Sequence, residues 1–161
     1  MKKLAKIFAV VLVCALAVAA LVACAPKPNT NYDEAKANLE KNGYAVSAVK
    51  FEEGDVEARI SATNAKSGDS VMIVWYRDAD AANDAYKEAK EDFEAGKKEY
   101  EEQMKEAKAQ LDKLEGTAKE IAQKAYDAMK EAFDEMIKNA VVGKSGNVVY
   151  TGTKNGINAT K

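Results

Sequence analysis

The segment from about residue 80 to residue 140 limits the possible folds of this chain more than any other feature, because it is one helical stretch rich in alanine and charge. Apolar side chains recur in it every seven residues, and others follow four residues after members of that series, as in a coiled-coil seam. The series contains Tyr86, Phe93, Tyr100, Ala107, Leu114, Ile121 and Ala128, and the offset positions are Met104, Leu111, Ala118, Ala125 and Ala132. We therefore predict a long, charged, coiled-coil-like helical arm.

The arm is expected to fold back on itself. One unbroken helix of this length would extend about 90 Å, at about 1.5 Å per residue, and would carry the next strand far from its sheet. Gly116 is the favoured site of the bend, because glycine can end a helix and the residues from Thr117 to Glu120 have the sequence of a capping box. Gly96 is a second candidate, and the seven-residue phase, which continues through Gly116, would also fit a continuous helix.

The sequences on both sides of the arm predict a small head. Short runs in which apolar and polar residues alternate are typical of strands with one solvent-exposed face. Val71–Tyr76 has no polar residue and is predicted to be a central strand covered on both faces. The expected elements are a helix at 32–42, strands at 44–51, 56–62, 71–76 and 147–151, and a final helix from Lys154. The predicted fold class is α+β: a small, mainly antiparallel sheet of about four strands with flanking helices, and the helical arm as a hairpin insertion between strands three and four.

The beginning of the chain has the layout of an export signal. A short basic segment, residues 1–6, precedes an unbroken run of 19 apolar residues from Ile7 to Ala25. A run of this length could also span a bilayer of about 30 Å, so an uncleaved signal anchor is the alternative. Either interpretation places the rest of the chain outside the cytoplasmic membrane, because the positive residues come before the apolar run.

The end of this run, Leu21-Val22-Ala23-Cys24, resembles the lipobox of bacterial lipoproteins. The resemblance implies that Cys24 receives a lipid on its thiol and that the signal peptide is cleaved between Ala23 and Cys24. We therefore expect a signal peptide at 1–23, a tether rich in proline and asparagine at 24–31, and a single domain at 32–161. The expected location is extracytoplasmic, with the chain lipid-anchored to a bacterial membrane through Cys24.

The residue types present exclude much catalytic chemistry. The chain has no histidine, and its two cysteines, Cys14 and Cys24, both lie in the leader region. Histidine-dependent nucleophilic catalysis and zinc, haem or iron–sulfur centres are thus excluded from the exported part. We predict no metal and no cofactor.

One acidic and one basic segment have partial similarity to known ligand-binding loops. The acids of residues 78–84 are similar to a calcium loop, but Ala82 and Ala89 stand where ligands are required, so we interpret them as caps of the long helix. Residues 143–146 are similar to the end of a phosphate-binding loop without its first glycine, and we interpret them as a turn before the fourth strand. Lys144 with Ser145 could form a catalytic pair only if these adjacent side chains pointed at the same place.

The aromatic side chains offer a choice between core and ligand surface. Trp75 lies in the wholly apolar strand, which favours the core. A place in the core and a place on a ligand-binding surface are likewise the two alternatives for Tyr44, Tyr76, Tyr100, Tyr126 and Tyr150.

Charge indicates the kind of partner. Residues 84–138 hold 16 acidic and 11 basic side chains, and mixed signs at helical spacing are typical of a solvated helix face. The acidic excess disfavours anionic partners, so we expect no nucleic-acid binding.

The two ends of the predicted head, residues 37–44 and 143–154, are similar to small clostridial-type lipoproteins of unassigned function. This resemblance implies an envelope protein with an α+β head and implies no activity. We predict a non-enzymatic protein- or ligand-binding module that contacts the membrane through Cys24, and another protein or a second copy through the arm. The alternative is a small hydrolase at the cell surface that uses carboxylates or the Ser145–Lys144 pair, although nothing singles out two carboxylates.

Overall fold

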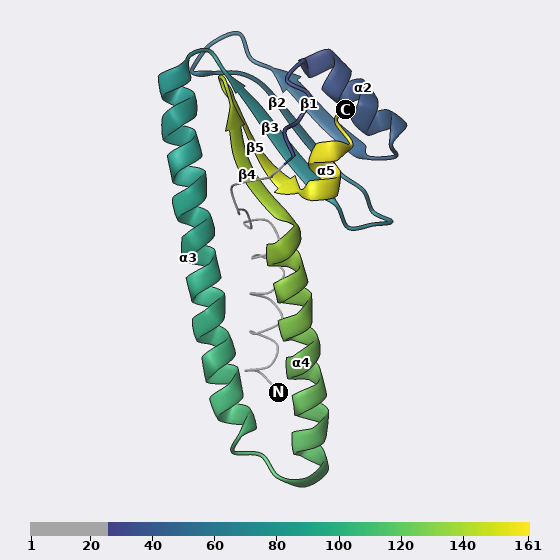
Figure 1. Ribbon diagram of the computed structural model, residues 1–161, viewed down its shortest axis with the longest axis vertical. Coiled ribbons are helices and arrows are strands. Elements are labelled where there is room, and N and C mark those ends of the chain that lie inside the picture. The colour runs from purple at the N-terminus through teal and green to yellow at the C-terminus, as the bar shows by residue number, and fades with distance from the viewer. Residues whose placement is uncertain (1–25) are drawn as a thin grey trace.

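The computed structural model describes residues 26–161, so the predicted signal peptide, Ala23 and Cys24 lie outside the described residues (Figure 1). The elements, in chain order, are α2 (Tyr32–Lys41), β1 (Ala45–Lys50), β2 (Val56–Thr63), β3 (Ser70–Tyr76), α3 (Ala79–Leu111), α4 (Gly116–Asn139), β4 (Ala140–Ser145), β5 (Val148–Thr153) and α5 (Lys154–Asn158). The α+β class is confirmed, as is the long helical insertion after the third strand. Figure 1 shows a head formed by the sheet with α2 and α5, from which α3 and α4 project as an arm.

The sheet has five strands in the order β1-β2-β3-β5-β4, and every neighbouring pair is antiparallel. The prediction of about four strands missed β4. The helical pattern of α4 runs into Ala140 without a glycine or proline to mark its end, so this short apolar strand looked like the last turn of the helix followed by a loop. Within β4, Gly143 lies opposite Tyr150, and a Cβ at this position would collide with the tyrosine ring.

The main core lies between one face of the sheet and the helices α2 and α5. The register of the strands aligns the inward-facing side chains in rows, such as Ile60 beside Ile73 beside Tyr150. Leu39 of α2 and Ile157 of α5 close this core, and both are fully buried. Helix α2 begins where the sequence predicts, because the Asn31 side chain caps it by accepting hydrogen bonds from its first turn.

The opposite face of the sheet is covered over only part of its width. Helix α3 packs on β4, β5 and β3, where Phe93 and Val142 form a second, smaller core with the half-buried Tyr86, Ala89 and Ile137. Strand β3 is central, as predicted, but the expectation that both of its faces are covered is wrong, because Met72 is 42% exposed. The covering helix lies over the β4 side of the sheet and leaves this part of β3 open.

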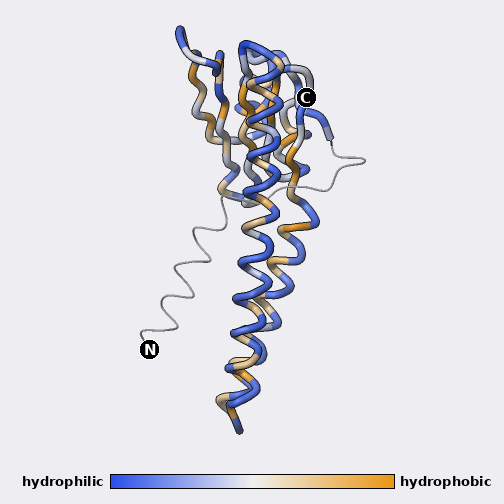
Figure 2. Tube along the Cα trace, turned by 90° about the vertical axis from the view of Figure 1, so that its left-hand side faces the viewer, coloured by the Kyte–Doolittle hydropathy of each residue, from blue (hydrophilic) through white to orange (hydrophobic). Residues whose placement is uncertain are grey.

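The arm is a hairpin of two helices. The chain reverses at residues 112–115, next to the predicted bend at Gly116, and Gly96 lies inside an unbroken α3. The predicted capping box at Thr117 is not used: α4 begins at Gly116, and its N-cap is Glu115, which makes no side-chain hydrogen bond. Figure 2 shows that the arm is predominantly hydrophilic along its length.

The predicted seam is only half right. On α3 it faces the partner helix, since Phe93, Met104 and Leu111 are buried. On α4 no residue is buried, and the seam residues are all exposed: Ala118, Ile121, Ala125, Ala128 and Ala132. The coiled-coil expectation therefore does not hold across the bend, because the turn restarts the helical phase and directs a different side of α4 at α3.

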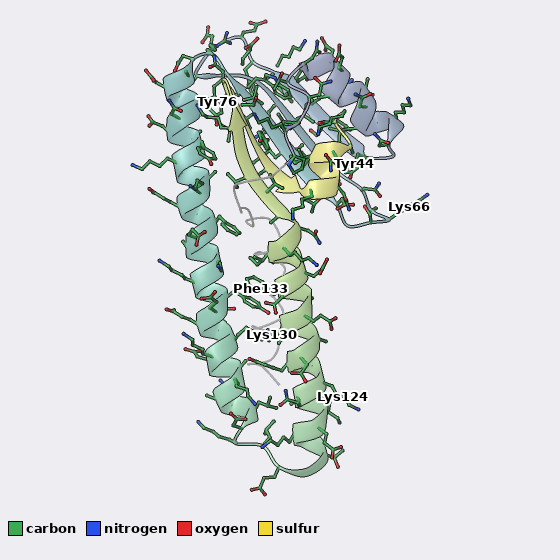
Figure 3. All side chains as sticks on the ribbon, viewed as in Figure 1. Tyr44, Lys66, Tyr76, Lys124, Lys130 and Phe133 are labelled. Carbon is green, nitrogen blue, oxygen red and sulfur yellow. The ribbon has the colours of Figure 1, made fainter. Side chains whose placement is uncertain are left out.

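The side of α4 that meets α3 is partly buried and consists of Ala122, Tyr126, Met129, Phe133 and Met136. The Tyr100 ring stacks on Phe133 with their centroids 3.4 Å apart. The Tyr100 hydroxyl donates to the carbonyl oxygen of Met129 at 3.0 Å. Figure 3 shows Phe133 in the space between the two helices.

Candidate binding groove

The uncovered part of the sheet and the foot of the arm enclose an open groove of about 700 Å³, which we call the sheet groove. Its floor is one row of side chains across the strands: Ser47, Ser61, Met72 and Thr151. Asp92 of α3 and Met136 of α4 line its arm side. The groove is therefore formed jointly by the sheet and the arm.

The strand register explains why these residues share one face. Successive residues of a strand point to opposite sides, so the positions between the buried core residues all point away from α2. Ser61 lies between the buried Ile60 and Ala62, and Met72 between the buried Val71 and Ile73. At the far end of the same row, Val142 lies beneath Phe93, so the groove ends where α3 begins to cover the sheet.

The groove is almost neutral. Of the residues 26–161 that line it, Asp92 alone has a charged side chain, and the polar groups are otherwise hydroxyls and backbone atoms. Hydroxyls both donate and accept hydrogen bonds, while Met72 and Met136 provide flexible apolar contact. Such a surface suits an uncharged, partly apolar segment better than a phosphate, a carboxylate or a cation.

The residues considered for catalysis are not assembled into a site. Lys144 and Ser145 are neighbours on β4 and point to opposite faces of the sheet, as their register with Val149 and Val148 shows. The Lys144 ammonium donates to the side-chain oxygen of Asn83 on α3. The predicted turn at 143–146 is thus largely strand, and the pair required by the hydrolase hypothesis is not formed.

The acidic cluster before the arm is used in helix capping, as predicted. The Asp78 carboxylate accepts a hydrogen bond of 2.8 Å from the backbone N–H of Ala81, at the start of α3. Asp80 lies in the first turn, where an acid complements the helix dipole. Residues 26–161 contain no group of three or more carboxylate side chains placed to hold a metal ion.

The prediction that Trp75 belongs to the core is confirmed. Its indole is buried, packs edge-to-face on Tyr32 with centroids 5.3 Å apart, and donates to the carbonyl oxygen of Thr30 at 2.7 Å. Tyr44 and Tyr150 are also buried, and burial raises the pKa of each hydroxyl above its usual value. None of these three aromatic rings lines the sheet groove.

The last part of the predicted tether lies against the head. Pro28 is buried, and the Asn29 N–H donates to the hydroxyl of Thr160 at 2.8 Å. Together with the bond from Trp75 to Thr30, these contacts fasten residues 28–31 on the side of the sheet that carries α2 and α5. The chain therefore enters the head on the face opposite the sheet groove.

Comparisons with protein-family models, with curated proteins and with solved structures give no match to this chain. Among the helices formed by residues 26–161, none has the length and apolar character needed to span a bilayer.

The sheet groove was not identified from the sequence, although a signal for it was present. Ser47 and Ser61 occupy solvent-exposed positions of the predicted strands, where small hydroxyls are unremarkable, and Thr63 follows the predicted end of the second strand. Only the strand order brings them beside Met72, and only the course of α3 leaves them uncovered. Small neutral side chains on an open sheet face, without the usual charges, would have been the clue.

Proposed function

We propose that this chain is a membrane-anchored envelope lipoprotein that binds a segment of another protein in the sheet groove. The observation that carries the proposal is the groove itself: about 700 Å³, open, nearly uncharged and lined by residues of the sheet and of two helices. Concave, mostly neutral surfaces with a few polar groups are typical of binding sites. The separation of Lys144 from Ser145 supports binding over hydrolysis.

The anchor is proposed from the lipobox-like end of the leader at Cys24. Because residues 28–31 are held on the head, only four residues, 24–27, separate these contacts from the start of the mature chain proposed here. Four residues reach at most about 14 Å at roughly 3.5 Å each. The face with α2 and α5 would then lie toward the membrane and the sheet groove away from it, where a partner in the envelope could enter.

Photo-crosslinking in intact cells tests the binding site. A photoreactive amino acid at Ser61, in the groove, is expected to give a discrete crosslinked adduct. The same group at Lys41, which is exposed on α2 behind the sheet, is the matched control. A groove that crosslinks no more than the control position would refute the proposal, and the mass of the adduct identifies the partner.

Mass spectrometry tests the anchor. A mature chain that begins at a lipid-modified Cys24 is expected, and Cys24→Ser should abolish the modification and the cleavage. Detection of an intact, unmodified chain starting at Met1 would contradict the anchor while leaving the groove proposal untouched.

A further inference from the structure

One face of α4 is apolar and has no partner among the described residues. It consists of Ala118, Ile121, Ala125, Ala128 and Ala132 of α4, which we call the free face. Ile121 is 66% exposed, the most exposed large apolar side chain of the described chain. The apolar arc of α4 thus covers about half of the helix circumference, and α3 contacts only half of that arc.

We propose that the free face binds the free face of a second copy of this chain, with the two α4 helices antiparallel, so that two arms form a four-helix bundle. This inference concerns the arm and is independent of what the sheet groove binds. Antiparallel helices with apolar residues at alternating three- and four-residue spacing pack by inserting side chains of one between those of the other. The short alanine side chains permit a close approach, and Ile121 would fill the space beside Ala132 of the second copy.

Charge complementarity selects one register. With the two-fold axis midway between Ala125 and Ala128, helical geometry places Lys124 opposite Glu131 of the second copy, and by symmetry Glu131 opposite its Lys124. A shift of seven residues in one direction would oppose Lys124 to Lys124, and in the other direction Glu131 to Glu131. Because like charges repel and opposite charges attract at such flanking positions, only the central register is favoured.

The α3 side of the arm is complementary in the same register. Asp92 and Met136 both line the sheet groove, so Met136 lies at the border between the side of α4 that meets α3 and the free face, and Asp92 marks the adjoining side of α3. Residues that follow Asp92 by 7, 11, 14 and 18 positions share its side of α3 by helical periodicity, and those that precede Met136 by 4, 11 and 18 lie at or beyond this border on the free face. They are Glu99, Gln103, Glu106 and Gln110 on α3 and Ala132, Ala125 and Ala118 on α4.

The contact of Tyr100 with Met129 and Phe133 shows which residues of α3 and α4 lie side by side along the arm. With this alignment of the two helices, the same two-fold axis brings Gln103 near Glu106 of the second copy. It likewise brings Glu99 near Gln110. An amide can donate to a carboxylate, so each of these glutamates has a hydrogen-bond donor opposite it.

The surface is large enough for a stable pair. A helix of 24 residues extends roughly 35 Å, and two helices side by side are roughly 20 Å wide, which gives roughly 700 Å² for each copy. Standard protein interfaces bury about 800 Å² on each side. A membrane surface is a poorer occupant, because Lys124, Glu131 and Glu135 flank the free face with mixed charge.

Cysteine crosslinking of the full chain in its membrane tests the contact. Two differently tagged copies carrying Ala125→Cys and Ala128→Cys are expressed together and oxidised. A disulfide between the two tags is expected, at least fivefold above the yield with Ala109→Cys in both, since Ala109 is exposed on the far side of α3. The parent chain without an added cysteine measures any contribution of Cys24.

A charge exchange tests the register. Lys124→Glu places two carboxylates opposite each other at both symmetry-related contacts with Glu131, so the dissociation constant should rise roughly tenfold in sedimentation of the full chain in density-matched detergent. The double variant Lys124→Glu with Glu131→Lys should restore association, because it exchanges the charges within each pair. Lys119→Glu, which makes the same charge change on the other flank of α4, should have little effect.

Equal crosslinking at position 109, or failure of the double variant to restore the pair, would overturn this inference. So would a crosslink of the free face to a different protein with no disulfide between the tags. None of these results affects the crosslinking at Ser61, so the fate of the sheet-groove proposal is decided separately.

Discussion

The two faces of the arm should respond differently to the loss of a large apolar side chain. We expect Leu111→Ala to destabilise the arm strongly and Ile121→Ala to change its stability little. Both residues belong to the same seven-residue pattern in the sequence, so a continuous coiled-coil seam would make the two substitutions equivalent. In the structure, Leu111 is 3% exposed and Ile121 is 66% exposed.

The expected magnitudes follow from these exposures. Replacing a buried leucine by alanine costs about 2–5 kcal/mol, and the lower end applies at the edge of a two-helix arm, so we expect about 2 kcal/mol for Leu111. Ile121 has only a third of its surface covered, so its truncation removes about 0.5–1 kcal/mol of burial. Alanine also has the higher helix propensity, by about 0.4 kcal/mol, which leaves a net cost of about 0.5 kcal/mol or less.

The measurement is urea unfolding of the full chain in mild detergent, followed by circular dichroism at high dilution, where paired copies separate. Hydrogen exchange of the α4 amides identifies losses confined to the arm. A cost for Ile121→Ala that equals or exceeds that of Leu111→Ala under these conditions would refute the placement of the free face. If the cost for Ile121 grows with chain concentration while that for Leu111 does not, the arm also self-associates.

Three further substitutions or conditions test the head. Trp75→Phe removes the hydrogen bond to Thr30 at a cost of about 1 kcal/mol, and limited proteolysis within residues 28–31 should become faster than in the parent chain. Gly143→Ala forces a Cβ against the ring of Tyr150 and should cost about 1–3 kcal/mol in urea unfolding; an unchanged midpoint would contradict the tight β4–β5 contact. Burial raises the pKa of Tyr44 and Tyr150 above the ordinary 10.0, so the stability that this gives is complete below pH 10 and is lost as the pH rises through the folded pKa values. Tyrosinate absorbance at 295 nm should therefore appear together with loss of circular dichroism, and free titration of every tyrosine at pH 10 in an intact fold would be inconsistent with their burial.

Local patterns predicted most of the elements in the head. The helix after Asn31, the alternating strands and the arm all lie close to their expected bounds, because capping residues and side-chain periodicity act over a few neighbouring positions. The predicted core role of Trp75 follows from the same local signal, since a wholly apolar strand has few alternatives to burial. Strand β4 was missed because its neighbour α4 carries the stronger periodic signal and no turn residue separates the two.

The arm shows where periodicity stops being informative. A seven-residue pattern identifies the apolar side of each helix, but a turn lets the second helix rotate about its own axis before it packs. In this chain Tyr100 packs between Met129 and Phe133, which fixes that rotation and leaves Ile121 outside. The same sequence pattern therefore describes a buried row on α3 and an exposed one on α4.

The sequence by itself determined the α+β class, the charged helical arm and the absence of histidine, and it is the sole basis of the predicted lipid anchor at Cys24. These properties depend on residue type and on spacing along the chain. Tertiary structure alone decided the strand order, the separation of Lys144 from Ser145, the sheet groove and the free face. Each of these depends on which distant surfaces meet, and that is settled by packing between elements, on which local periodicity carries no information.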